Sequence, residues 1–386
     1  YEYLIIRGNN FGTVNNPGAP IVFYRSLPGA DSQDSNITRF DAIACNVSIP
    51  HTEMKCYTQP GAGVSYILEL KIEGQNSVVA TTTYGIPEIT AITGPGASSA
   101  QGDGNQTVYI SGNNFGPFGN KQFFQSVTYG EQGVEYVADC VHHGHTSIEC
   151  KTTAGTGADL FWQVTILGQT NLLSSNGRTS YAPPNVGESI PVKIETNGGK
   201  IMQLVGSNFG ISDSAHRPVE TFVDIYLSDR TVRKSLELSL TESGLKQTYA
   251  ASYGVHFIAF EAPELDCLSC TSNFGVEVVT ISNSGAELVS EKFFVQFQNA
   301  SIEHIYVIDG TKATTRHLEI TGENFGAIGN VYIIDETTNA IGDPLPRVVD
   351  GIIPDSLSYI ISYDHETIHV EFNGYSGELT VERAGD

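Results

Sequence analysis

Apolar and polar side chains alternate in short segments along the chain, and four of these segments end in the same phrase. The phrase is Gly-x-Asn-Phe-Gly, at residues 8–12, 112–116, 206–210 and 322–326. Before each copy, the residues two and four positions back are apolar, as Leu4 and Ile6 are in the first copy, and the residues between them are mixed. An apolar period of two predicts a strand with one face towards a core and the other towards water.

The distance between the copies gives the size of the repeating unit. Their first glycines, Gly8, Gly112, Gly206 and Gly322, are 104, 94 and 116 positions apart. This is the size of an immunoglobulin-type sandwich and is far longer than a solenoid repeat. We therefore predict an all-β chain of four tandem immunoglobulin-like sandwiches in an elongated array. Their predicted ranges are named repeat 1 (1–86, N-terminally incomplete), repeat 2 (87–182), repeat 3 (183–298) and repeat 4 (299–386).

The phrase itself favours a structural role. Its glycines and Asn suit a turn with positive φ, and its Phe can cover the open end of a sandwich. A glycine-rich stretch can also hold phosphate, but only where a helix N-terminus follows. Here each copy leads into loop and strand, as at residues 19–24. We therefore interpret the phrase as a turn and not as a phosphate site.

The chain is strongly acidic. Its 386 residues include 43 Asp and Glu against 20 Lys and Arg, for a net charge of −23. Such a surface repels phosphate backbones and anionic lipid heads, so nucleic acid is not expected as a partner. The sequence has no apolar run of the roughly 20 residues that span a bilayer and no signal-peptide pattern at its start. A signal peptide and a membrane anchor are therefore expected outside this sequence.

The six cysteines fall into three close pairs. The segments that end in Cys56 and Cys150 align, so the same disulfide is predicted twice, between Cys45 and Cys56 and between Cys140 and Cys150. Repeats 3 and 4 carry apolar residues at the position of the second cysteine, which are Phe260 and Val370. This position is therefore expected to face the core.

A zinc site is the alternative to the second disulfide, because His142, His143 and His145 lie between Cys140 and Cys150. Repeat 1 has the equivalent cysteines without such histidines, which favours the disulfide. The three histidines are then interpreted as solvated loop residues. No metal and no cofactor are expected.

Cys267 and Cys270 have the spacing of a thioredoxin-type redox motif, but that motif needs a helix N-terminus in an α/β fold. The pattern here predicts no such helix, so a local disulfide is expected instead. Asn-x-Ser/Thr occurs four times, at Asn36, Asn46, Asn105 and Asn299. Together with the paired cysteines, these sites favour the secretory route and N-linked glycans.

The phrase after a strand, followed by a later strand that ends in Cys, resembles the IPT/TIG domain of plexin-type receptors, and the resemblance covers essentially the whole chain. In repeat number and Asn-, Thr- and Ser-rich composition the chain also resembles the tiger family of social amoebae. That resemblance implies a receptor of the cell surface, or a secreted form, in heterophilic cell adhesion and self-recognition (allorecognition). It further implies a cell-surface protein as partner, with a related TIG-domain protein as one candidate.

No catalytic residue is predicted. The sequence has neither Gly-x-Ser-x-Gly nor His-Glu-x-x-His, and acidic pairs such as Glu261 with Glu264 or Asp364 with Glu366 are expected by chance among 43 acidic residues. The alternative function is a carbohydrate-binding accessory module of a secreted protein, which would need a row of exposed aromatics. The single Trp, Trp162, alternates like a residue of a core strand.

Repeat 3 differs from the others in its basic residues. It holds eight of the 20 Lys and Arg, lacks a glycosylation site, and contains an insertion-like stretch at 224–234. Two interpretations of Arg230, Arg233 and Lys234 stay open. They either contact an acidic partner protein, or they are solvated residues of a strand edge that prevent edge-to-edge pairing.

Overall fold

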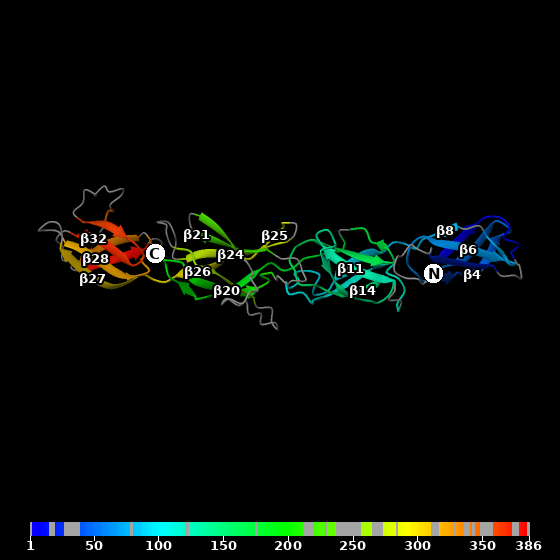
Figure 1. The fold of residues 1–386 in the computed structure, drawn as a ribbon, viewed down its shortest axis with the longest axis horizontal. Helices are drawn as coiled ribbons and strands as arrows, with labels where there is room; N and C mark the ends of the chain where they lie inside the picture. The colour runs from blue at the N-terminus through cyan, green and yellow to red at the C-terminus, as the bar shows by residue number, and fades with distance from the viewer. Residues whose placement is uncertain are drawn as a thin grey trace. The chain divides into compact units, whose positions relative to one another are not determined.

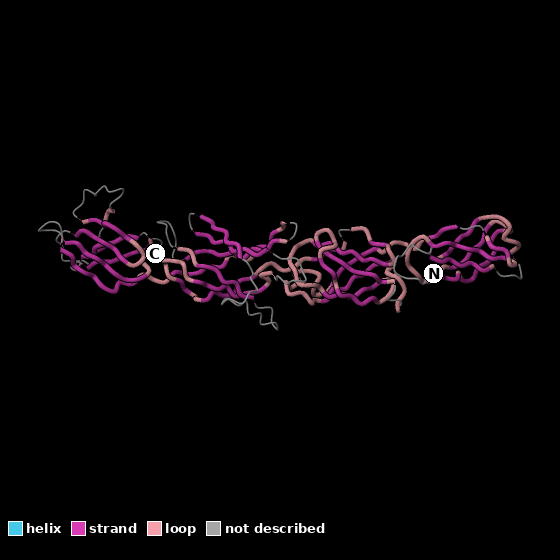
Figure 2. Tube along the Cα trace, in the orientation of Figure 1, coloured by secondary structure: helices cyan, strands magenta, loops and turns pink. Residues whose placement is uncertain are grey.

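The computed structural model consists of β-strands and loops, and Figure 2 shows no helix among the residues that the structure describes. These are residues 2–14, 20–26, 39–77, 80–119, 123–173, 176–210, 220–227, 230–236, 256–264, 273–282, 285–309, 316–327, 329–335, 340–341, 344–347, 358–372 and 378–383. The all-β class expected from the sequence is therefore confirmed.

The chain divides into two compact units, Tyr1–Ala182 and Pro183–Asp386. The border between the units coincides with the border predicted between repeats 2 and 3. Each of the four repeats contains two sheets, and within the described ranges no sheet combines strands of two repeats. The strands can be followed by their labels in Figure 1.

The strands of repeat 1 are β1 (Tyr3–Arg7), β2 (Ile21–Ser26), β3 (Arg39–Asp41), β4 (Ile43–Ile49), β5 (Glu53–Tyr57), β6 (Tyr66–Ile72), β7 (Gln75–Asn76) and β8 (Ala80–Thr82). One sheet has the order β1-β5-β4, and the other has the order β3-β2-β6-β7 with β8 also paired to β6. Val22, Met54 and Leu68, which come from both sheets, are buried in one core.

The strands of repeat 2 are β9 (Glu88–Thr93), β10 (Thr107–Asn113), β11 (Phe124–Gly130), β12 (Tyr136–Val137), β13 (Asp139–His142), β14 (Ser147–Lys151), β15 (Leu160–Ile166), β16 (Gln169–Thr170) and β17 (Arg178–Thr179). They form one sheet in the order β13-β14-β10-β9 and one in the order β12-β11-β15-β16, with β17 paired to β15. Every second residue of β15 is buried, which fits a strand with one face on a core.

The strands of repeat 3 are β18 (Asn185–Ile190), β19 (Lys193–Ile194), β20 (Ile201–Ser207), β21 (Glu220–Leu227), β22 (Arg230–Leu236), β23 (His256–Glu261), β24 (Asn273–Ile281), β25 (Glu287–Val289) and β26 (Phe293–Phe297). The sheets have the orders β18-β20-β23 and β19-β26-β24-β21-β22, with β25 paired to β24. Met202, Val223 and Val276 lie in the core between them.

The strands of repeat 4 are β27 (Ser301–Asp309), β28 (Arg316–Glu323), β29 (Gly329–Asp335), β30 (Ala340–Ile341), β31 (Tyr359–Tyr363), β32 (Thr367–Phe372) and β33 (Glu378–Arg383). The sheets have the orders β27-β28-β32-β31 and β30-β29-β33. Ile320, Val331 and Ile368 are buried between them.

A strand runs into every copy of the repeated phrase, as predicted: β1, β10, β20 and β28. The phrase then forms the same turn each time. Its Asn has a positive φ of 64°, 62°, 59° and 61° in the four copies, and its last glycine has a positive φ of 84°, 88°, 84° and 76°. Asn and Gly are the residues that enter this left-handed region most readily, so these two positions are explained by the backbone.

The first glycine of the phrase was expected to supply positive φ as well, and this expectation was wrong. Gly112 does not belong to the residues with positive φ. A Cβ at Gly112 would instead overlap the carbonyl oxygen of Glu88 and the ring of Phe115. Because Phe115 is fully buried, its ring has no room to move away. The same two obstacles recur at Gly206 and Gly322, so close packing explains this glycine.

The position of the second cysteine faces the core in all four repeats, as predicted. Cys56 lies opposite Leu4 and Cys150 opposite Val108, and the equivalent pairs in repeats 3 and 4 are Met202 with Phe260 and Leu318 with Val370. The four residues at this position, Cys56, Cys150, Phe260 and Val370, are at most 5% exposed. In repeats 3 and 4 an apolar residue therefore occupies the place of the buried cysteine, and the register between the two paired strands is unchanged.

Candidate functional site

Both disulfides predicted in repeats 1 and 2 are present in the structure. Cys45 in β4 is bonded to Cys56 in β5, and Cys140 in β13 is bonded to Cys150 in β14. Cys140 and Cys150 are opposite one another in the register of two neighbouring strands. Each bridge thus fastens an antiparallel hairpin within one sheet. The third predicted pair, Cys267 and Cys270, lies outside the described residues.

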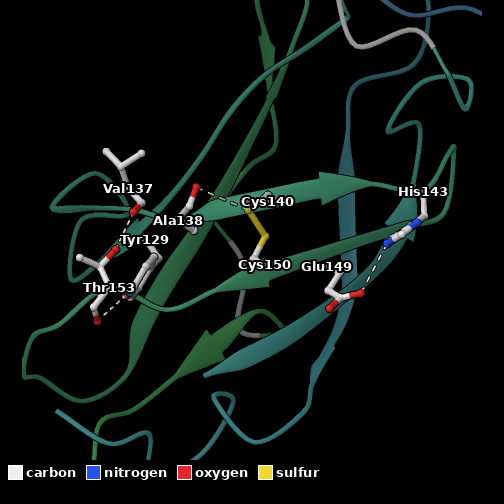
Figure 3. The surroundings of a disulfide bond; sticks show 8 residues. All are labelled: Tyr129, Val137, Ala138, Cys140, His143, Glu149, Cys150 and Thr153. Atoms are coloured by element: carbon white, nitrogen blue, oxygen red, sulfur yellow. Dashed lines mark hydrogen bonds and ion pairs between the residues drawn. A yellow bond between two sulfur atoms is a disulfide. The ribbon is translucent and has the colours of Figure 1, made fainter. Parts of the chain in front are cut away.

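The histidines beside the second disulfide do not form a zinc site. His143 makes an ion pair of 3.5 Å with Glu149, and Figure 3 shows this pair on the hairpin away from the sulfur atoms. His145 is partly buried in the turn before β14, and burial lowers the pKa of its imidazole. Within the described part of the chain, no three His, Cys, Asp or Glu side chains are grouped so that they could hold a metal ion.

The expectation of three solvated loop histidines was wrong for His142. This residue ends strand β13 and is half-buried, and its ring stacks on Phe124 with 5.6 Å between ring centroids. Burial lowers the pKa of His142. The period-two pattern of β13 is too short to reveal this burial from the sequence.

Three of the four predicted glycosylation sites have exposed asparagines, which are Asn46, Asn105 and Asn299. Asn46 lies on β4, whereas Asn105 and Asn299 are in loops. The fourth, Asn36, is outside the described residues. An exposed side chain is the condition that a glycan requires, and the structure meets it at these three positions.

The basic residues of repeat 3 belong to a hairpin that includes the insertion-like stretch at 224–234. Arg230, Arg233 and Lys234 lie on β22, which pairs residue by residue with β21. Among the described strands, β22 is the outermost of its sheet. The three residues therefore lie on a sheet edge, which is compatible with both interpretations given above.

Trp162 is a core residue, as its alternation predicts. It is 1% exposed, its ring stacks on that of Tyr129 at 4.3 Å, and its Nε1 donates a hydrogen bond of 2.9 Å to Oγ1 of Thr179. The only tryptophan of the chain is thus not available as a platform for a sugar ring.

Glu264 and Asp364, one residue of each close acidic pair, have partners in the structure. Glu264 contacts Nε2 of His365 at 3.0 Å, and the carboxylate of Asp364 accepts hydrogen bonds from the amides of Glu366 and Thr367. The second arrangement is a turn between β31 and β32.

A pair of buried tyrosines recurs in repeats 1 and 2, and the sequence analysis did not find it. In repeat 2, the hydroxyls of Tyr129 and Tyr181 are 2.6 Å apart, Tyr129 accepts from the amide of Thr153, and Tyr181 donates to the carbonyl of Thr153. We call these three residues the tyrosine bracket of repeat 2. Burial raises the pKa of both tyrosines, so their hydroxyls are neutral.

The bracket of repeat 1 has the same geometry. The hydroxyls of Tyr24 and Tyr84 are 2.7 Å apart, and the amide and carbonyl of Gln59 bond to them at 3.0 and 2.7 Å. Gln59 follows the end of β5 that pairs with Tyr3, so the bracket is at the end of the sandwich away from the phrase. The signal in the sequence was the similarity of Thr82-Thr83-Tyr84 to Thr179-Ser180-Tyr181.

Buried polar contacts join the two repeats within the first unit. The side chain of Gln169, 4% exposed, accepts from the amide of Gly63 at 3.1 Å and donates to the carbonyl of Tyr84 at 2.9 Å. Asn114 of the repeated phrase donates to the carbonyl of Ile86 at 2.9 Å. The phrase of repeat 2 thus holds the segment through which the chain enters that repeat.

The second unit uses the same Asn at its own junction. The side-chain oxygen of Asn324 accepts from the amide of Thr196 at 3.2 Å. His365 bonds to the hydroxyl of Thr196 and to Glu264, both at 3.0 Å. The contacts of both junctions hold neighbouring repeats together. At the second junction a hydroxyl, an imidazole and a carboxylate are joined in one chain, and the hydroxyl of Thr196 is fully buried.

A pocket of about 430 Å³ opens at the junction of repeats 1 and 2. Repeat 1 lines it with the tyrosine bracket and with residues 2–4, 58–61 and 82–85, and repeat 2 with residues 113–114 and 145–146. Glu2 is the only carboxylate in this lining, and Lys and Arg do not occur in it. Apart from the carboxylate of Glu2 and the imidazole of His145, the pocket offers neutral hydroxyl, amide and backbone groups to a ligand.

No helix of the described residues is long and apolar enough to cross a membrane. This finding covers the ranges of the chain given with the fold.

Comparisons with known proteins identify one part of the chain. No curated protein matches the chain. It is similar to the extracellular region of plexin A4, domains 1 to 10, with 11% identity and a TM-score of 0.21 over 100% of this chain and 40% of that one. It is similar to the FN1–FN3 domains of chicken CNTN1, with 6% identity and a TM-score of 0.17 over 73% of this chain and 91% of that one.

It is also similar to dimeric latent PorU from Porphyromonas gingivalis, with 10% identity and a TM-score of 0.19 over 73% of this chain and 30% of that one. These similarities carry no argument about function. The chain spans 40% of the plexin A4 region that it matches. The informative match is to the IPT/TIG domain family, which covers residues 87–181. Repeat 2 therefore contains an IPT/TIG domain.

Proposed function

We propose that this chain is the extracellular, receptor-like part of a cell-surface protein and that it binds a partner protein through its tandem sandwiches. The proposal rests on one turn, which occurs in the IPT/TIG domain of repeat 2 and again in the other three repeats. The phrase of repeat 2, with its positive-φ Asn114 and buried Phe115, is reproduced in the other three repeats. We propose accordingly that repeats 1 to 4 are four IPT/TIG domains in an elongated array.

The disulfides support an extracellular location. Paired cysteines persist in oxidising compartments and are rare in the cytosol. The chain has such pairs in two repeats, and three sequons with exposed asparagines accompany them. We infer N-linked glycans at Asn46, Asn105 and Asn299, and a membrane anchor outside this sequence.

Binding accounts for the surface better than catalysis does. In the parts of the chain that the structure describes, the titratable residues picked out by the sequence belong to turns, junctions or ion pairs. Glu264 is joined through His365 to the hydroxyl of Thr196, but Thr196 is fully buried, so this hydroxyl is not accessible to a substrate. A carbohydrate-binding module is not favoured by Trp162, because that ring lies in the core.

The finer function that we propose is heterophilic adhesion between cells with a role in self-recognition. Its support is the resemblance in repeat number and composition to the tiger family. A related TIG-domain protein on another cell is the partner that this resemblance implies.

Bead clustering tests the proposal. Beads coated with this protein are mixed with each other, with beads that carry other tandem IPT/TIG ectodomains, and with albumin-coated control beads. We expect mixed clusters with one class of ectodomain and none with albumin. Clusters of the protein with itself alone would contradict heterophilic binding. Absence of any clustering, together with absence of bead attachment to cells, would contradict a role in adhesion.

A further inference from the structure

Two histidines from neighbouring strands meet on the outer face of repeat 4. Figure 1 shows β28 and β32 side by side, and these strands are paired in one sheet. Leu318 and Val370 are opposite one another in this pairing and are buried in the core. Their neighbours His317 and His369 therefore lie on the other face of the sheet. Nε2 of His317 and Nδ1 of His369 are 3.2 Å apart, although 52 positions separate the two residues in the sequence.

The rings are placed so that these two nitrogen atoms face each other. The ring centroids are 5.3 Å apart, and the ring planes are at 90°. A tetrahedral zinc ion holds each imidazole nitrogen at about 2.0–2.1 Å, which places two such nitrogens about 3.3 Å apart and their ring centroids about 5.2 Å apart. The distances of 3.2 and 5.3 Å between the two histidines are close to both values. The pair therefore already has the spacing of two ligands on one ion.

A buried carboxylate lies beside the pair. Glu371 is directly opposite His317 in the register of β28 and β32, and it is only 7% exposed. Among the residues that the structure describes, its carboxylate has neither a hydrogen bond nor an ion pair. A buried carboxylate is costly unless a donor or a cation compensates its charge. A cation held by the neighbouring histidines would supply this compensation.

The composition of repeat 4 also favours a cation. Residues 299–386 include 15 Asp and Glu against four Lys and Arg. Imidazole nitrogen is a preferred ligand of zinc and similar transition metals, whereas Ca²⁺ and Mg²⁺ require oxygen ligands. Within the described ranges no three ligating side chains are grouped. The protein thus offers two nitrogens, and water can fill the other positions around an ion.

We propose that His317 and His369 bind one divalent transition-metal ion, such as Zn²⁺, on the outer face of repeat 4, and that the charge of Glu371 supports this ion. Each neutral ring keeps one proton throughout. The ring that donates across the contact in the free protein carries its proton on the other nitrogen when the ion is bound. The proposal does not depend on the proposed role in adhesion.

Isothermal titration of the full chain with ZnCl2 tests the pair. We expect the wild type to bind one Zn²⁺ ion that His369→Gln no longer binds, because a single nitrogen ligand is left. His304→Gln is the matched control, because His304 is exposed on β27 of the same sheet and its ring stacks on Tyr306 instead of a second imidazole. Loss of this ion in both variants, or in neither, would contradict the site.

A measurement on the unchanged protein does not depend on the folding of the variants. Diethyl pyrocarbonate modifies free imidazole nitrogens, and peptide mass spectrometry reads each histidine separately. We expect Zn²⁺ to protect His317 and His369 from modification and to leave the rate at His304 unchanged. Equal rates at the pair with and without Zn²⁺ would show that the contact is a hydrogen bond only and would overturn the proposal.

Ca²⁺ in the same experiment separates nitrogen ligation from simple attraction by acidic residues. Because this ion prefers oxygen ligands, it is expected to leave both histidines reactive. Protection by Ca²⁺ equal to that by Zn²⁺ would also overturn the proposal.

The variant Glu371→Gln examines the carboxylate beside the pair. It keeps both nitrogen ligands and removes one negative charge, so Zn²⁺ should still bind, roughly tenfold more weakly, as is typical when an outer partner of a metal site is lost. An unchanged affinity would contradict the role assigned to Glu371.

Discussion

At the first glycine of the repeated phrase, close packing alone leaves no room for a Cβ atom. At Gly112 a methyl group would have to displace both the carbonyl of Glu88 and the buried ring of Phe115. One obstacle is backbone and the other is a ring without free space, so neither can give way cheaply. The same exclusion at Gly206 and Gly322 explains why the residue recurs.

Gly112→Ala is expected to lower the free energy of unfolding of repeat 2 by about 3 kcal/mol, the upper range for overpacking a core. Urea unfolding followed by the fluorescence of Trp162 measures this, since the only tryptophan lies in repeat 2. Ser111→Ala is the control, because Ser111 points outward on the same strand and is exposed. A midpoint for Gly112→Ala equal to that of the control would contradict the packing argument.

The tyrosine bracket places two ionisable hydroxyls in the core without burying a charge, because both stay protonated. Tyr181→Phe removes the shorter of two hydrogen bonds to the carbonyl of Thr153, which keeps the one from Tyr129 at 3.3 Å, and is expected to cost about 1 kcal/mol, the net contribution of one hydrogen bond. Tyr109→Phe serves as control, since the ring of Tyr109 is 45% exposed. An equal effect of the two substitutions in the urea experiment would show that the bracket adds no stability.

The same bracket predicts sensitivity to alkaline pH. Burial raises the pKa of Tyr129, Tyr136 and Tyr181 in the folded state, so the unfolded chain loses its phenolic protons first, at its usual pKa of about 10. The stabilisation is complete below about pH 10 and is lost as the pH rises beyond it. The urea midpoint of repeat 2 should fall between pH 9 and pH 11. The fall should be smaller for Tyr181→Phe, and an identical fall would contradict this assignment.

At the scale of elements, each disulfide fastens two neighbouring strands of one sheet. The bridge from Cys140 to Cys150 spans a sequence separation of 10 residues. Closing so short a loop is expected to contribute about 2–3 kcal/mol in the chain-entropy description. The buried partner also packs in the core, in the position that Val370 occupies in repeat 4.

The double variant Cys140→Ala with Cys150→Val should therefore keep the fold and lose about 2–3 kcal/mol. The variant Cys140→Ala with Cys150→Ser should lose more, because a hydroxyl without a partner then replaces the buried sulfur. Circular dichroism and urea unfolding compare the two proteins. A serine variant at least as stable as the valine variant would contradict the core assignment of this position.

Local patterns were sufficient to predict part of these elements. The strand before each phrase, the two disulfides and the core position of Phe260 and Val370 follow from residues a few positions apart in one repeat and from the alignment of repeats. The brackets could not be predicted this way, since Tyr24 and Tyr84 are separated by 60 positions and Tyr129 and Tyr181 by 52. Only the sandwich brings them together.

Contacts at junctions were equally hidden from the sequence. Gln169 bonds to Gly63 across 106 positions, and nothing in its neighbourhood distinguishes it from a surface glutamine. The pairing of the insertion-like stretch 224–234 was hidden as well, since its first residues belong to β21 and its last to β22.

At the scale of the whole molecule, the proposed elongated array predicts a large maximum dimension in solution. The longest strands have 9 residues and span about 30 Å, so a sandwich with its end turns is roughly 35 Å long and four placed end to end extend over about 140 Å. The radius of gyration of such a rod is about 40 Å, whereas a compact globule of this length has about 21 Å. Small-angle X-ray scattering of the monomer distinguishes the two values. A radius near that of the globule would contradict the array.

The net charge of −23 makes the approach of another acidic protein unfavourable, except where basic residues gather. Strand β22, the outermost described strand of its sheet, carries three of them, which are Arg230, Arg233 and Lys234, in a repeat without a sequon. A glycan would exclude a partner from such an edge. Complementary charge there would speed association at low ionic strength and would lose this effect in high salt.

The triple variant Arg230→Glu, Arg233→Glu, Lys234→Glu tests this edge against the partner that clusters with the protein on beads. By surface plasmon resonance at low ionic strength, we expect the association rate constant to fall by about tenfold or more, since steering changes this constant over such a range. At high salt the variant and the wild type should converge. If an equally well-folded variant keeps the association rate and the salt dependence of the wild type, the basic residues only protect the strand edge from pairing. The contact then lies on another surface, and the two N-terminal repeats are the next place to substitute.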